Sequence, residues 1–145
     1  VFAELTRTVH VLLPSEDVCG PALCRTLQCL AAHACRERDE ARAVFCAGCV
    51  ARLMEDLAAH DRRGWAFLYA HQILQAYLSA VDRAGGRARL DAVCRAFLPG
   101  VCALLSICND EQVRRVHYLA TAPGKAYLQE LRDVYQREFQ YKGKA

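Results

Sequence analysis

Apolar residues recur along almost the whole chain at intervals of three and four, and no segment shows the sustained alternation expected of a strand. Positions spaced in this way fall on one side of an α-helix, because one helical turn takes 3.6 residues. Glycine and proline interrupt the pattern and divide it into about seven helices. The sequence therefore predicts an all-α fold, and a length of 145 residues suits a single helical domain, residues 1–145, with a buried core.

Proline and acidic residues indicate where the first three helices begin and end. A first helix is expected over residues 2–13 with a stop at Pro14, and Pro21 is expected to start the second. Asp39 is a suitable N-cap for the third, because its carboxylate accepts hydrogen bonds from unpaired backbone amides. The apolar faces of the second and third helices comprise Leu23, Leu27, Leu30 and Ala34, and then Cys46, Cys49, Val50, Leu53 and Leu57.

The fourth helix, about residues 64–83, is apolar over a wide arc and is expected at the centre of the fold. Gly85-Gly86 separates it from a fifth helix, which Pro99 is expected to kink. Asp110 is expected to cap a short sixth helix that Pro123-Gly124 ends, before a last helix to about Gln140. The positions expected to be buried are Trp65, Phe67, Leu68, Tyr69, Ile73, Leu74, Tyr77, Leu78 and Val81 in the fourth helix, Leu90, Cys94, Phe97, Val101, Leu104 and Cys108 in the fifth, and Leu128, Leu131, Tyr135 and Phe139 in the last.

Helices of this length joined by short turns suit two arrangements. One is a compact helical bundle, and the other is an irregular stack of antiparallel helix pairs of the HEAT or armadillo kind. No residue-level repeat in the sequence chooses between them. The charged outer faces and the proline in the fifth helix favour the end cap of a helical repeat. We therefore expect the chain to be the C-terminal end of a longer helical-repeat protein.

Charge is distributed unevenly along the chain. Positions 1–110 hold twelve acidic and twelve basic residues, so the formal net charge of +3 arises after residue 110. A charge this small does not by itself indicate dedicated RNA binding. Charged residues also interrupt every apolar run well before the roughly 20 residues that a membrane span requires. The arginines fit either a basic ridge at helix ends or, as we prefer, a solvated face: Arg62, Arg63, Arg83, Arg87, Arg89, Arg114 and Arg115.

Nine cysteines are the most conspicuous candidates for chemistry. Cys46-Ala-Gly-Cys49 is the only Cys-x-x-Cys pair, and a structural zinc site would need a second pair of ligands at comparable spacing. His33 and Cys35 are the nearby candidates. Because Cys46 and Cys49 share a stripe with aliphatic residues, we interpret them as reduced thiols packed in the core. A small zinc or thiol protein built on this pair is the less favoured alternative.

Recognisable catalytic motifs are missing from the sequence. The three serines lie outside any Gly-x-Ser-x-Gly elbow, and the paired acidic residues fall at helix starts or on polar faces. His71 lies at helical spacing among apolar residues, which is more typical of a hydrogen-bonded core imidazole than of a base. We therefore expect no enzymatic activity, no cofactor, no metal and no small-molecule substrate.

The final residues differ from everything before them. An apolar helix over residues 127–139 is followed by Tyr141-Lys142-Gly143-Lys144. In one interpretation the helix docks on the core and the two lysines are solubilising ends. In the other, Tyr141, Lys142 and Lys144 bind a partner or touch RNA phosphate, because aromatic and cationic side chains together favour interfaces.

The same ending carries a resemblance. Residues 131–145, Leu-Arg-Asp-Val-Tyr-Gln-Arg-Glu-Phe-Gln-Tyr-Lys-Gly-Lys-Ala, resemble the terminus of the C-terminal domain of the Urb/Npa family of nucleolar proteins, of the Npa2 type. Residues 97–105, Phe-Leu-Pro-Gly-Val-Cys-Ala-Leu-Leu, are similar to the penultimate helix of that family. The family pattern has a larger aliphatic residue where this chain has Ala145.

This resemblance implies a non-enzymatic scaffold domain of a nucleolar ribosome biogenesis factor. Its implied role lies in large ribosomal subunit assembly and rRNA processing. The partners implied are other assembly factors, among them a large helical Urb/Npa partner and a DEAD-box helicase, with contact to pre-ribosomal RNA as a secondary feature. It also favours a partner-binding role for Tyr141, Lys142 and Lys144. The competing interpretation is a generic intracellular helical adaptor for protein binding.

Overall fold

The computed structural model of the chain describes residues 16–60 and 64–140. Within these ranges the chain forms six α-helices and no strand, so the all-α prediction is confirmed. The first expected helix, residues 2–13, lies outside the described residues. The elements are α2 (Glu16–Arg36), α3 (Glu40–His60), α4 (Trp65–Arg83), α5 (Asp91–Ile107), α6 (Asp110–Leu119) and α7 (Ala122–Val134), which continues as a π-helical turn, η2 (Tyr135–Gln140).

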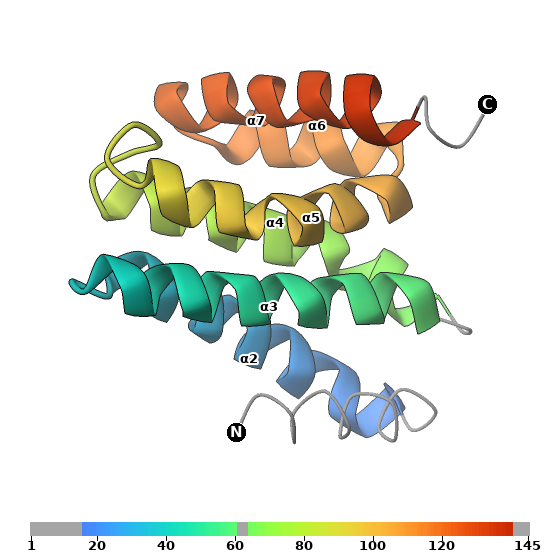
Figure 1. Cartoon of the computed structure of the whole chain (residues 1–145). Helices are drawn as coiled ribbons and strands as arrows, with labels where there is room; N and C mark the ends of the chain where they lie inside the picture. The colour runs from blue at the N-terminus through green and yellow to red at the C-terminus, as the bar shows by residue number, and fades with distance from the viewer. Residues whose placement is uncertain (1–15, 61–63, 141–145) are drawn as a thin grey trace.

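The helices are stacked as antiparallel pairs in three layers (Figure 1). α2 and α3 form one layer, α4 and α5 the middle layer, and α6 and α7 the last. α2 packs on α4 and α3 packs on α5, while α6 and α7 cover the other side of the middle layer. This order corresponds to the helical-repeat arrangement of the two that the sequence allowed. The central position expected for the fourth helix is confirmed, since α4 contacts α2, α5, α6 and α7.

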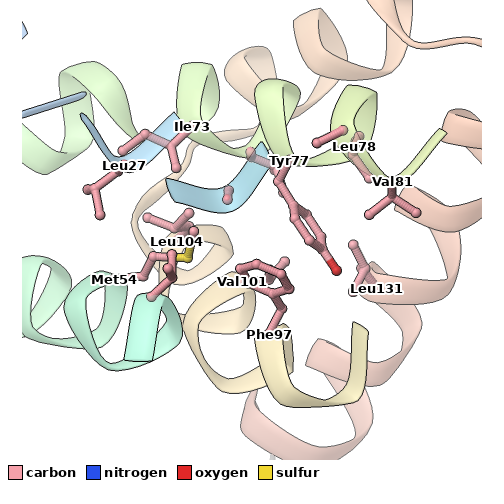
Figure 2. Packing of buried hydrophobic residues seen from close by; sticks show 14 of the residues in the cluster. Leu27, Met54, Ile73, Tyr77, Leu78, Val81, Phe97, Val101, Leu104 and Leu131 are labelled. Carbon is pink, nitrogen blue, oxygen red and sulfur yellow. The ribbon is translucent and has the colours of Figure 1, made fainter. Parts of the chain in front are cut away.

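One apolar core runs through all three layers. Side chains of α2, α3, α4, α5 and α7 meet in it, as Figure 2 shows for Leu27, Met54, Tyr77, Phe97 and Leu131. Burial of these side chains is the main source of folding free energy. The helical spacing predicted many of the core positions correctly, among them Leu27, Ala34, Val50, Leu53, Leu57, Ile73, Leu74, Tyr77, Leu78, Val81, Cys94, Phe97, Val101, Leu104, Leu128 and Leu131.

The seam between α3 and α5 depends on small residues. Gly100 is buried where the two helices cross, and a Cβ atom there would lie 2.6 Å from Cα and 2.8 Å from the carbonyl oxygen of Ala51. Backbone atoms cannot move aside as a flexible side chain can, so only glycine allows this approach. Pro99, next to it, is exposed within α5.

Three predicted helix boundaries were wrong, each for a local reason. α2 begins at Glu16 and contains Pro21. Asn109, and not Asp110, caps α6, because its side chain forms a reciprocal capping box with Gln112. Pro123 belongs to the first turn of α7, where a missing amide hydrogen removes no helical hydrogen bond. The predicted N-cap Asp39 is confirmed, since its carboxylate accepts a hydrogen bond from the Arg42 amide at 3.3 Å.

The predicted burial of Phe67 and Leu68 was wrong. Their side chains are 39% and 59% exposed. Both lie near the start of α4, whose apolar arc is wider than the area that the neighbouring helices cover. α4 therefore presents apolar side chains outside the core as well as in it.

Candidate functional site

The last helix leads to the predicted tail, and its start is fixed by hydrogen bonds. Thr121 caps α7, because its hydroxyl oxygen accepts a hydrogen bond from the Gly124 amide at 3.2 Å. The same hydroxyl donates to the carboxylate of Asp82 in α4 at 3.2 Å. The cap thus ties α7 to the middle layer.

A buried pair of tyrosines joins α7 to α4. The hydroxyl oxygens of Tyr77 and Tyr127 lie 2.7 Å apart, and the Tyr77 ring packs against Phe97 with 4.7 Å between ring centroids. Burial raises the pKa of both phenols, so both stay protonated at neutral pH and one hydroxyl donates a hydrogen bond to the other. A phenol at each end allows a hydrogen bond inside an otherwise apolar core.

Arg87 extends this connection to the turn between α4 and α5. Its guanidinium lies 5.5 Å from the centre of the Tyr127 ring and pairs with Asp91 at 2.5 Å and Glu130 at 3.3 Å. Its hydrogen bond to Asp91 lowers the pKa of that carboxyl group, which also pairs with Arg95. We call Arg87 with Asp91 and Glu130 the arginine clamp on α7. Arg87 is therefore partly enclosed by contacts between elements and does not belong to the solvated face that we preferred for it.

The end of the last helix is less enclosed than predicted. Tyr135 is half-buried and packs against the core, but Phe139 is 41% exposed, so its predicted burial was wrong. η2 belongs to the outermost layer described, where only the side that faces the middle layer is covered. The predicted partner-binding residues Tyr141, Lys142 and Lys144 lie outside the described residues.

Four arginines gather at the end of the stack where the α2–α3 and α4–α5 turns lie. Arg36 and Arg38 come from the first turn, and Arg83 and Arg89 flank the second. All four are exposed and line one hollow of about 760 Å³. Within the described part of the chain, none of them forms an ion pair. The turn between α4 and α5 requires glycine, since Gly85 and Gly86 have φ of 114° and 94°.

A second hollow, of about 470 Å³, continues from the first along the seam between α2 and α4. The two share Arg36 and Arg83. The second is lined otherwise by alanines and by polar side chains, namely Gln28, Gln72, Gln75 and Ser79. We call the two hollows together the arginine trough.

The cysteine pair does not stand out as a chemical site. Cys46 and Cys49 are half-buried free thiols in α3, and Cys46 packs against the core. Within residues 16–60 and 64–140, no group of three or more histidine, cysteine and acidic side chains could hold a metal ion. Cys35, which lines the arginine trough, is buried, and burial raises the pKa of its thiol to about 12, so it is not a thiolate at neutral pH.

Sequence reasoning named Arg83 and Arg89 but missed Arg36 and Arg38. In a stack of helix pairs, alternate turns lie at the same end, so arginines beside two such turns become neighbours. The signal was present in the sequence as basic residues on both sides of each turn. It could be used only once the pairing of the helices was known.

None of the helices in the described ranges is long and apolar enough to cross a membrane. The geometry thus defines a layered helical domain with a polar, arginine-lined trough. The sequence of residues 4–144 matches the Urb2/Npa2 family, and the chain belongs to that family. It is a family of ribosome biogenesis factors and is not a known enzyme family. No match was found among curated proteins or among solved structures.

Proposed function

We propose that this chain is a non-enzymatic scaffold domain of a nucleolar ribosome biogenesis factor that acts in large-subunit precursor assembly and rRNA processing. The observation that carries the proposal is the family match over residues 4–144. A scaffold needs a rigid body with exposed binding faces, and stacked helix pairs with one continuous core supply that body. We further propose that residues 1–145 act as one unit.

Within this role, we propose that Tyr141, Lys142 and Lys144 contact a partner. The contact geometry of α7 supports this, because Thr121, Tyr127 and the arginine clamp hold the helix that precedes these residues. Docking of the helix on which these residues follow lowers the entropic cost of a contact made through them. By the family resemblance, the partners are a large helical Urb/Npa protein and a DEAD-box helicase.

The test is deletion of residues 141–145 in the tagged protein expressed in cells. We expect assembly-factor recovery from nuclear extract to fall several-fold and thermal stability to stay nearly unchanged, because the role proposed for these residues is in binding and not in folding. The matched control is Arg52→Gln, an exposed change in α3. Full recovery with the deletion, or a sharply lower melting temperature, would reject the binding role of the tail. Exclusion of the whole protein from the nucleolus would reject the proposed function itself.

A further inference from the structure

We propose that the arginine trough binds the phosphate backbone of RNA. Arg36, Arg38, Arg83 and Arg89 converge on it from two turns that are about 50 residues apart in the sequence. A guanidinium presents several N–H donors in one plane, which suits two oxygens of a phosphate group. This surface is separate from the tail and from the clamp on α7.

The charge balance of the trough favours an anion. Glu37 and Glu40 also line the hollow, which leaves two more cations than anions among its side chains. The Glu37 carboxylate accepts a hydrogen bond from the Asp39 amide at 3.2 Å. Glu40 lies in the first turn of α3, where a negative charge interacts favourably with the helix dipole. Both acids therefore have local roles, while the four arginines form no ion pair within the described residues.

Arg89 lies beside the glycine turn. A Cβ atom at Gly85 would lie 2.6 Å from Cδ of Arg89. Glycine at position 85 therefore leaves the space that the Arg89 side chain occupies at the edge of the trough.

The lining of the trough distinguishes RNA from a protein partner. Protein interfaces have aromatic or aliphatic anchors at their centre and are poor in charge there. Nucleic-acid interfaces are more polar and more positive. The polar lining of the trough comprises four arginines, two glutamates, three glutamines and a serine. No aromatic side chain lines it, and its large aliphatic side chains are Leu90 and Val93, at one end. It therefore matches RNA better than a protein.

The same lining indicates how RNA would be read. Sequence-specific contacts to single-stranded RNA use aromatic side chains that stack on bases. Without such side chains in the trough, recognition rests on phosphate and ribose oxygens, with amides such as Gln75 as additional donors and acceptors. We expect binding with little sequence preference and strong dependence on salt.

The experiment measures binding of the purified 145-residue chain to a fluorescent oligouridine of about 20 nucleotides by anisotropy. Replacing all four arginines with glutamine should weaken binding at low salt by at least about tenfold. A plot of the logarithm of the binding constant against the logarithm of the salt concentration has a negative slope. The size of this slope should decrease by about 0.7 for each phosphate that the variant no longer neutralises. A smaller variant, Arg36→Gln with Arg83→Gln, should lie between the parent and the fourfold variant.

The matched control is Arg52→Gln with Arg114→Gln, which removes as many charges as the double trough variant but from exposed positions outside the trough. It should bind RNA as the parent does. Circular dichroism melts should be unchanged in all variants, and if the fourfold variant melts early, the double variants decide the question. Equal weakening by the control, or unchanged binding by the trough variants, would overturn the proposal.

A polyglutamate peptide of the same length tests the protein alternative. If it binds the parent more tightly than oligouridine does, and the trough variants no longer bind it, the trough is a site for acidic protein and the RNA proposal fails. Bare RNA binding requires none of the assembly partners. Its outcome is therefore independent of whether the scaffold role in ribosome assembly holds.

Discussion

The two sides of the middle layer are joined to their neighbours by different means. On one side, α5 meets α3 through Gly100 and Ala51, with apolar side chains around them. On the other, α7 also buries apolar side chains such as Leu128, but the hydroxyl pair of Tyr77 and Tyr127 and the ion pair of Arg87 with Glu130 add polar links. Close packing tolerates no added volume, whereas a buried polar network tolerates no missing partner. The first seam should respond to size and the second to hydrogen-bonding capacity.

Of the substitutions that test how the two seams are joined, the largest effect is expected at the α3–α5 seam. Gly100→Ala should lower the free energy of unfolding by about 2–3 kcal/mol, because the new methyl group meets the Ala51 backbone and forces the helices apart. Urea denaturation of the purified chain measures this.

Gly48→Ala is the control for this substitution, since it also lies inside a helix but has no atom within 4 Å of its added Cβ. It should raise stability by about 0.5–1 kcal/mol, because alanine favours helix over glycine. Two substitutions of the same kind should thus have opposite signs. If both substitutions changed the free energy of unfolding in the same direction, the close approach of α3 and α5 would not explain why position 100 is glycine.

A smaller effect is expected at the polar seam. Tyr127→Phe should cost about 1–2 kcal/mol, because it leaves the buried Tyr77 hydroxyl with only the weakly bonding thiol of Cys94 beside it. Adding Tyr77→Phe should cost little more, since both partners are then apolar. Chemical denaturation of the two single variants and the double variant gives the coupling energy. If the stability loss of the double variant equals the sum of the two single losses, the two hydroxyls have no coupling energy.

The smallest effect is expected beyond both seams. Phe139→Ala should change the free energy of unfolding by less than about 1 kcal/mol, because the side chain is 41% exposed in the outermost layer. Leu131→Ala, in the same final helix but 2% exposed, should cost about 3 kcal/mol. Thermal melts compare the two directly. A large destabilisation by Phe139→Ala would mean that the outer face of η2 is part of the core.

Local patterns account for what could be predicted from the sequence. The spacing of Leu53, Phe97 and Leu131 identified buried faces correctly, because helical periodicity depends only on near neighbours. The cap of α6 was misplaced by one residue although Asn109 and Gln112 have the spacing of a capping box. The spacing of these two residues is thus enough to place the cap at Asn109.

The rest depends on contacts between distant parts of the chain. Tyr77 and Tyr127 are 50 residues apart, and neither position differs locally from an ordinary apolar helix position. The exposure of Leu68 depends on how far neighbouring helices reach, which periodicity does not encode. The neighbourhood of Arg36 and Arg83 likewise follows from the stacking of layers. The trough therefore required the three-dimensional arrangement, and the tail residues Tyr141, Lys142 and Lys144 stay a prediction.

The layered order also determines where the molecule opens first. Each layer is stabilised mainly by the one beside it, so α6 and α7 can separate from the middle layer while α3 and α5 stay packed. Such partial opening requires less free energy than global unfolding and governs the exchange of amide hydrogens with solvent. Amides of α7 should therefore exchange sooner than those of α5. A partner that binds the docked form of α7 would therefore stabilise this helix more than any helix of the middle layer.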